Sequence, residues 1–241
     1  MTKKFSLILI ILALAIIGAI TYVVWPSATP TTTTVYAPTI DSADFSTTIT
    51  NPWLTLMPGR KFTYQGQTAE GLERVEIEIT GATKTVMGVE TVVYSDHVWL
   101  NGELAEDTRD YLAQDSAGNV WYFGEDVDNY ENGEITDHDG SWLAGTDGAQ
   151  PGIWFKANPQ VGGEYRQEYY AGEAEDTAEV LSTNETVSTP VGEFTGCVKT
   201  YDWTPLDPDA QEHKYYCPVV GGLVLEVDLQ TNDRVELIAF N

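Results

Sequence analysis

Apolar and polar residues alternate with a period of two through most of the chain after residue 51. The runs "ERVEIEIT" (residues 73–80) and "VETVVYSDHVWL" (residues 89–100) are clear examples. Successive side chains of a strand point to opposite faces of a sheet, so this alternation is typical of half-buried β-strands. Turn-forming pairs such as Asn101-Gly102 and Asn132-Gly133 separate the runs. Because helical periodicity is absent from this region, we predict an all-β, antiparallel domain over residues 51–241.

This domain divides into two related halves, about residues 51–140 and 155–241. The segment "RDYLAQDSAGNVWYFGE" in the first half corresponds to "EHKYYCPVVGGLVLEVD" in the second, with Tyr111 matching Tyr215. Each half has an opening strand, a long strand, a hairpin and a strand after a Gly-containing turn. Two pseudo-repeated meanders of this kind predict a curved sheet that forms an open barrel or a sandwich.

The N-terminus carries a long uncharged run, "FSLILIILALAIIGAITYVVW" (residues 5–25), preceded by two lysines. At 1.5 Å per residue it spans roughly 30 Å, enough to cross the hydrocarbon core. The preceding lysines favour a cytoplasmic N-terminus. We therefore predict a signal-anchor transmembrane helix over residues 1–26, single-pass in the cell membrane, with the C-terminal domain extracytoplasmic. A cleaved signal peptide ending near Ala28 is the alternative. The Thr- and Pro-rich residues 27–50 are predicted to be a linker.

The chain is strongly acidic. It has 12 Lys and Arg against 37 Asp and Glu, a formal net charge of −25. Such a surface repels phosphate backbones and excludes nucleic acid as a partner. The acidic excess suits divalent cations, cationic partners, or solubility in a salty medium. The partners that we expect are the membrane, through the N-terminal helix, and a small apolar ligand or an envelope protein.

Cys197 and Cys217 are the two cysteines of the chain, and such a pair can be metal ligands, a redox couple or a structural disulfide. Outside the cytoplasm, thiols meet an oxidising environment in which disulfides persist. Strand-like sequences around both cysteines flank "TPLDPDA", a turn composition centred on Asp207. A hairpin with this centre places the cysteines opposite each other within disulfide range. The sequence therefore predicts a disulfide.

The same register predicts a cluster of polar and aromatic side chains on the face of the hairpin that carries the cysteines, with Lys199 opposite Tyr215 and Tyr201 opposite His213. Cross-strand packing on a half-exposed face explains such a cluster equally well. Tryptophans in strand-like runs are usually core residues. Trp142 and Trp154 instead lie in residues 141–160, which we predict to be an irregular crossover between the halves. A long loop of this kind often lines a binding site. The candidate ligand-binding residues are therefore Trp142, Trp154, Lys199, Tyr201, His213 and Tyr215.

The acidic stretch "GEDVDNYENGEITDHDG" is the best candidate for a metal site. From Asp128 it follows the pattern of a calcium-binding loop at Asn132, Gly133 and Asp139. It departs from that pattern at the third position, which is Tyr130, and a glycine-containing hairpin turn explains Asn132-Gly133 without a metal. No cofactor is expected apart from calcium at Asp128, Asn132 and Asp139.

Several segments resemble a family of uncharacterised exported prokaryotic proteins. They include "NPWLTLMPGRKFTYQG", "GNVWYFGEDV", "GSWLAGTDGAQPGIWFKANPQVGGEYRQEYYAGEAED" and "EHKYYCPVVGGLVLEV". The resemblance implies export, membrane anchoring and a β-rich domain of unknown function. It brings no activity and no catalytic residues.

We therefore expect a membrane-tethered, non-enzymatic, extracytoplasmic β-domain that binds a ligand or partner at the cell surface. One alternative is a secreted glycan hydrolase acting through a carboxylate pair, since the 37 acidic residues offer many such pairs. The other alternative is a purely structural envelope module. No catalytic residue is assigned.

Overall fold

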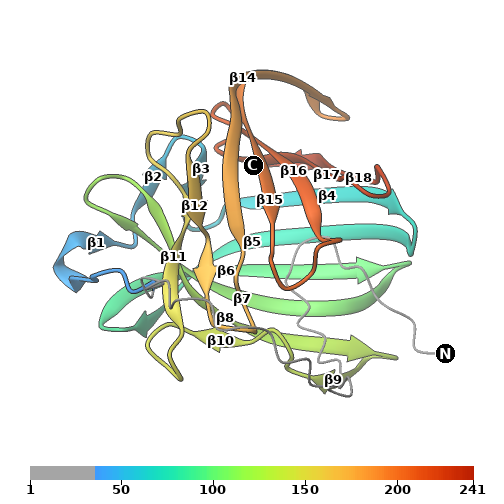
Figure 1. Ribbon diagram of the computed structural model, residues 1–241. Helices are drawn as coiled ribbons and strands as arrows, with labels where there is room; N and C mark the ends of the chain where they lie inside the picture. The colour runs from blue at the N-terminus through green and yellow to red at the C-terminus, as the bar shows by residue number, and fades with distance from the viewer. Residues whose placement is uncertain (1–35) are drawn as a thin grey trace, which may run out of the picture.

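The computed structural model of the protein describes residues 36–241 (Figure 1). Apart from one short 3-10 helix, η1 (Ser42–Asp44), its regular elements are all strands. The described strands are β1 (Phe45–Ser46), β2 (Ile49–Asn51), β3 (Leu54–Leu56), β4 (Lys61–Thr68), β5 (Gly71–Val86), β6 (Val89–Leu100), β7 (Glu103–Asp115), β8 (Val120–Glu131), β9 (Glu134–Asp137), β10 (Trp142–Leu143), β11 (Gln150–Phe155), β12 (Glu164–Arg166), β13 (Glu168–Tyr169), β14 (Thr177–Thr189), β15 (Gly192–Trp203), β16 (Gln211–Cys217), β17 (Gly222–Asp228) and β18 (Arg234–Phe240).

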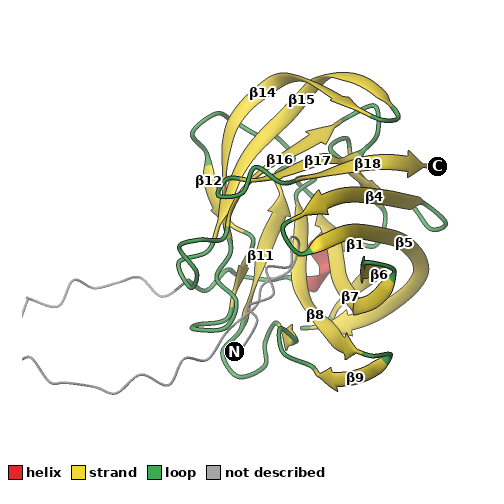
Figure 2. Ribbon diagram, turned by 90° about the vertical axis from the view of Figure 1, so that its right-hand side faces the viewer, coloured by secondary structure: helices red, strands yellow, loops and turns green. Residues whose placement is uncertain are grey.

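Nearly all of these strands belong to one antiparallel sheet that curves into a barrel. The order in the sheet is β12-β14-β15-β16-β17-β18-β4-β5-β6-β7-β8-β11-β13. The strands at the two ends of this path, β12 and β13, are consecutive in the chain and separated by Gln167 alone. The sheet therefore returns on itself and is nearly closed. Figure 2 shows the meander β14–β18 forming the upper wall and the meander β4–β8 curving below it.

The closure depends on one close approach of two backbones. Gly152 on β11 lies against the chain between β12 and β13, where a Cβ atom on residue 152 would come within 2.2 Å of the carbonyl carbon of Gln167. A residue with a side chain would force these backbones apart. Gly152 therefore allows residues 164–169 to pass from β14 to β11 and complete the barrel.

One end of the barrel is covered by the small separate hairpin β2–β3. Its Ile49, Leu54 and Leu56 side chains are buried in the core. The hairpin also contacts turns of both meanders: the Thr55 amide donates to the Gly221 carbonyl at 2.9 Å, and Asn51 Nδ2 donates to the Gly118 carbonyl at 3.0 Å. These contacts fix β2–β3 across one end of the barrel.

The predicted linker of residues 27–50 ends earlier than its composition indicates. β1 and the start of β2 lie within it, and Phe45 packs edge-on against Phe123 with the ring centroids 5.3 Å apart. The apolar side chains Phe45 and Ile49 anchor this Thr-rich segment to the sheet.

The predicted signal-anchor, residues 1–26, and residues 27–35 lie outside the described part of the chain. Within residues 36–241, no helix is long and apolar enough to cross a membrane.

The crossover of residues 141–160 is more regular than predicted, because it contains β10 and β11. β11 pairs with β8 and extends the sheet toward its closure. β10 also pairs with β8, with Trp142 opposite Glu125. The segment is thus part of the barrel wall, and its side chains are placed by strand register.

The predicted register of the cysteine hairpin is confirmed. Lys199 lies opposite Tyr215 and Tyr201 opposite His213 in the pairing of β15 with β16. Cys197 and Cys217 form a disulfide with Cα atoms 4.3 Å apart. Both sulfurs are buried in the core.

Loss of this disulfide is expected to destabilise the domain moderately. It closes a loop with a sequence separation of 20, and cross-linking a loop of that length removes about 3 kcal/mol of chain entropy from the unfolded state. On reduction, the urea midpoint of unfolding should move to a lower concentration, and the free energy of unfolding should fall by about 3 kcal/mol. The C197A/C217A double variant should match the reduced protein and be insensitive to the reductant. An unchanged midpoint would contradict the assignment.

Candidate functional site

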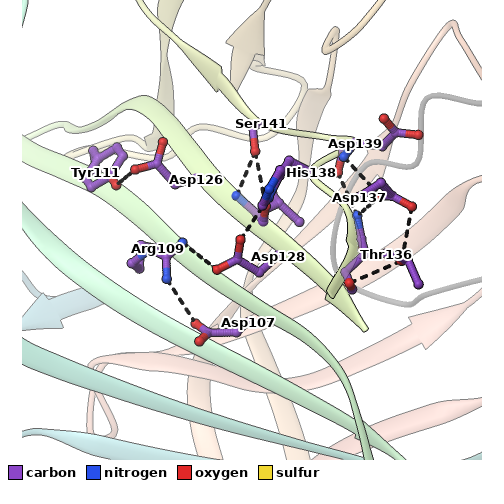
Figure 3. Close-up of polar contacts among 12 residues, drawn as sticks. Asp107, Arg109, Tyr111, Asp126, Asp128, Thr136, Asp137, His138, Asp139 and Ser141 are labelled. Carbon is purple, nitrogen blue, oxygen red and sulfur yellow. Dashed lines mark hydrogen bonds and ion pairs between the residues drawn. The ribbon is translucent and has the colours of Figure 1, made fainter. Parts of the chain in front are cut away.

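A ladder of charged side chains runs over the outer face of β7, β8 and β9 (Figure 3). Arg109 Nη2 lies 2.9 Å from Asp128 Oδ2, and Arg109 Nη1 lies 3.8 Å from Asp107 Oδ1. His138 Nδ1 lies 2.8 Å from Asp128 Oδ1. These pairs are partly exposed to solvent, so each contributes little to stability. Together they hold the segment after β9 against the barrel wall.

The three candidate metal ligands lie in this region but at different places. Asp128 is on β8 and is engaged by Arg109 and His138, whereas Asn132 is in the β8–β9 turn and Asp139 follows β9. Asn132 and Gly133 have φ of 53° and 79°, the conformation of a tight hairpin turn. Within residues 36–241 no group of three or more His, Cys, Asp or Glu side chains is arranged to hold a metal ion. The geometry of this hairpin therefore does not support the predicted calcium site.

The polar and aromatic cluster predicted on β15 and β16 is brought together on the outer surface. Lys199, Tyr201, His213 and Tyr215 are all half-exposed. Lys199 Nζ lies 5.4 Å from the centroid of the Tyr215 ring, and the Tyr201 and His213 rings lie 6.3 Å apart. Burial, with a smaller contribution from Lys199, lowers the pKa of His213. The cluster matches its predicted geometry, and its role in binding stays a prediction.

Trp142 and Trp154 point into the barrel. Trp142 is buried, and its Nε1 donates to Glu125 Oε1 at 3.2 Å. Trp154 lies against the Tyr94 and Tyr122 rings, with centroid distances of 5.8 and 4.8 Å. Trp142 meets Tyr122 edge to face at 5.3 Å. The tryptophans thus form an aromatic wall inside the barrel rather than a platform on its surface.

The interior beside this wall is lined with carboxyl side chains. They come from both meanders and lie toward the end of the barrel that carries the β4–β5, β6–β7 and β17–β18 turns. Each is less than one-tenth exposed. These interior carboxyls are Glu73, Asp96, Glu106, Asp110, Glu125, Glu168, Asp202 and Glu226.

One part of the interior holds its own cation. Lys214 on β16 is largely buried, and its Nζ lies 3.1 Å from Glu212, 3.6 Å from Glu226 and 4.0 Å from Asp202. Burial alone would lower the pKa of Lys214, but these carboxylates outweigh burial and raise the pKa well above its usual value. Lys214 therefore places an ammonium group within the barrel, held by three carboxyl side chains.

A second set of interior carboxyls, on β6, β7, β8 and β13, has no such partner within residues 36–241. Asp96, Asp110, Glu125 and Glu168 form no ion pair with any Lys, Arg or His among the described residues. Asp110 and Glu125 are opposite each other on β7 and β8. Tyr122 Oη donates to Asp110 Oδ1 at 2.6 Å. Both oxygens of Asp96, and one oxygen each of Glu125 and Glu168, are buried and have no hydrogen-bond partner within residues 36–241.

Burial keeps these carboxyls from ionising at their usual pH. It raises the pKa of Glu73 to about 8 and the pKa of Glu106 to about 7. Burial also raises the pKa of Asp110 to about 7, and the pKa values of Asp96 and Glu125 rise well above their usual range because burial is reinforced by neighbouring carboxyls. The raised pKa values of Glu73, Glu106 and Asp110 therefore lie near neutral pH, and these carboxyls attract positive charge once they ionise.

The sequence contains a signal for this interior. In "ERVEIEI" Glu73 has the same phase as the buried residues Val75 and Ile77, and in "YSDHV" Asp96 has the phase of Tyr94 and Val98. An acidic residue in phase with the apolar positions of a strand must point into the core.

No family model, curated protein or solved structure matches this chain. The barrel and its acidic interior are therefore the features from which a function can be proposed.

Proposed function

We propose that the protein is a membrane-tethered, non-enzymatic, extracytoplasmic β-barrel that binds a small cationic ligand in its interior. The tether is the signal-anchor expected over residues 1–26. The proposal rests on the buried carboxyl oxygens of Asp96, Glu125 and Glu168 that have no hydrogen-bond partner among residues 36–241. A buried carboxylate is costly unless it is paired or hydrogen-bonded, so a bound cation would stabilise the ionised barrel.

The acidic interior changes the class of ligand from the one suggested by the sequence. An apolar molecule would leave the carboxyl oxygens unpaired, whereas a cation would pair with them. The net charge of −25 also favours a cation, because the field of the protein raises the concentration of positive ions around it.

The glycan-hydrolase alternative gains no support from the same geometry. A polysaccharide must reach both the acid and the nucleophile or base of a hydrolase. Asp110 and Glu125 face each other on neighbouring strands but are 1% and 0% exposed. A purely structural module remains the outcome if no ligand binds.

Native mass spectrometry of the full-length protein, purified in detergent from the envelope of its own host, tests the proposal. At pH 8 we expect an adduct that dissociates at pH 4, because protonated carboxyls no longer hold a cation. A protein of unmodified mass at pH 8 would show that the interior has no natural ligand. An adduct removed by organic extraction but not by acid would identify an apolar ligand and contradict the proposal.

A further inference from the structure

The two parts of the barrel interior differ in how their carboxyl charge is balanced. Around Lys214, a four-carbon side chain delivers one ammonium group to Glu212, Glu226 and Asp202. The repeat that aligns Tyr111 with Tyr215 also aligns Asp110 with Lys214. Where one half of the domain places an ammonium ion inside the barrel, the other half places a further carboxyl.

From this difference we infer that Asp96, Asp110, Glu125 and Glu168 bind the ammonium group of a small alkylamine. This inference rests on the cation-binding function proposed above and names the class of the cation. The bound amine would occupy the same environment in the first meander that Lys214 occupies in the second.

The hydrogen bonds around these carboxyls leave acceptors for an ammonium ion. Tyr122 and Trp142 each donate to one carboxyl oxygen, on Asp110 and Glu125 respectively. The second oxygen of Glu125, one oxygen of Glu168 and both of Asp96 are buried and have no hydrogen-bond partner in the part of the chain that the structure describes. An ammonium group has three donors and no acceptor, so it complements a set of acceptors of this kind.

The aromatic side chains favour an organic cation over a metal ion. Tyr94, Tyr122, Trp142 and Trp154 pack against one another beside these carboxyls. Aromatic faces attract ammonium groups, and their apolar surface accommodates an alkyl chain. Calcium needs six to eight oxygen ligands at about 2.3–2.6 Å, a tighter convergence than the roughly 2.7–3.2 Å of ammonium hydrogen bonds. No group of three or more acidic or His side chains within residues 36–241 converges closely enough to hold a metal.

The test uses n-butylamine, because its alkyl chain and ammonium group reproduce the side chain of Lys214. Isothermal titration of the full-length protein in detergent at pH 8.5 should show saturable binding. Binding should be absent with n-butanol, which has the same chain without the charge. It should also be lost at pH 4, where the carboxyls hold protons.

Variants locate the bound amine. Glu125→Gln and Asp96→Asn should each weaken butylamine binding about tenfold or more, the effect of losing a hydrogen bond to a charged group. Glu134→Gln, an exposed change on β9, should leave binding unchanged. Equal affinity in Glu125→Gln, Asp96→Asn and the unmodified protein would overturn the location. The titrations of the unmodified protein decide the ligand class even where a variant fails to fold.

Calcium chloride separates the failure of this inference from the failure of the proposed function. If calcium binds at pH 8.5 and butylamine does not, the barrel binds cations but the ammonium inference is wrong. If neither ion binds and no natural adduct is found, both proposals are wrong. If butylamine binds and calcium does not, both are supported.

Discussion

The unfolding temperature of the protein is expected to fall as the pH rises from 5 to 9, by roughly 10–20 °C for a chain of this size. Burial raises the pKa of Glu73 from 4.5 to about 8, with Glu212, Glu70, Asp233 and Glu106 adding repulsion. The folded state therefore keeps a proton that the unfolded chain releases above pH 4.5. This contribution is fully present below pH 4.5 and is lost as the pH rises through 8.

The size of the effect follows from the pKa shift. For Glu73 alone the shift corresponds to a loss on the order of 5 kcal/mol at high pH. Burial also raises the pKa values of Glu106, Asp110 and Asp176 to about 7, so they act in the same direction over the same range. Self-repulsion of the net charge of −25 adds to the loss once the interior ionises.

Thermal unfolding of the full-length protein, followed by circular dichroism at pH 5.5, 7 and 8.5, measures this effect. Glu73→Gln should raise the unfolding temperature at pH 8.5 and flatten the pH dependence, because an amide cannot ionise. The matched Glu134→Gln change on the exposed strand β9 should alter neither. An unfolding temperature that is constant or rises toward pH 8.5 would show that the interior carboxyls do not carry raised pKa values.

The local features of the fold could be predicted from the sequence because they depend on neighbouring residues. The period-two runs gave the strands, and the symmetric placement of Cys197 and Cys217 about Asp207 gave the register of one hairpin, including the disulfide. Closure of the barrel depends on β18 pairing with β4 and on the passage of residues 164–169 past Gly152. These contacts join distant segments, and no local pattern specifies them.

The site residues could be predicted only in part for a related reason. The positions of Lys199 and His213 could be predicted because hairpin register is local, whereas their role in binding stays a prediction. The sequence analysis does not single out the interior carboxyls, because acidic residues are normally solvated. The phase of Asp96 with Tyr94 and Val98 indicates that it faces the core. Which other carboxyls share that interior is set by the curvature of the sheet, a property of the whole barrel.

Removal of the interior ammonium ion is expected to destabilise the barrel strongly. Lys214→Met keeps most of the side-chain volume but leaves Glu226, Glu212 and Asp202 without their shared counter-ion. Breaking a buried ion pair from one side costs about 3–5 kcal/mol, because the remaining charges are uncompensated. Urea unfolding at pH 8 should show this loss. At pH 4 the loss should shrink, since burial raises the pKa of Glu226 well above its usual value and also raises the pKa of Asp202, so less negative charge is left unpaired there.

Lys199→Met provides the matched control, because Lys199 is on the neighbouring strand with its ammonium over the exposed face of Tyr215. Its loss should change the unfolding free energy by about 1 kcal/mol or less, as for other exposed cation–π contacts.

Adding Glu226→Gln to Lys214→Met should recover part of the stability lost at pH 8, because the amide removes one unpaired charge. If Lys214→Met is as stable as the unmodified protein at pH 8, the carboxyls around it are already neutral there. The interior would then hold protons rather than cations, and the analogy between Lys214 and a bound amine would fail.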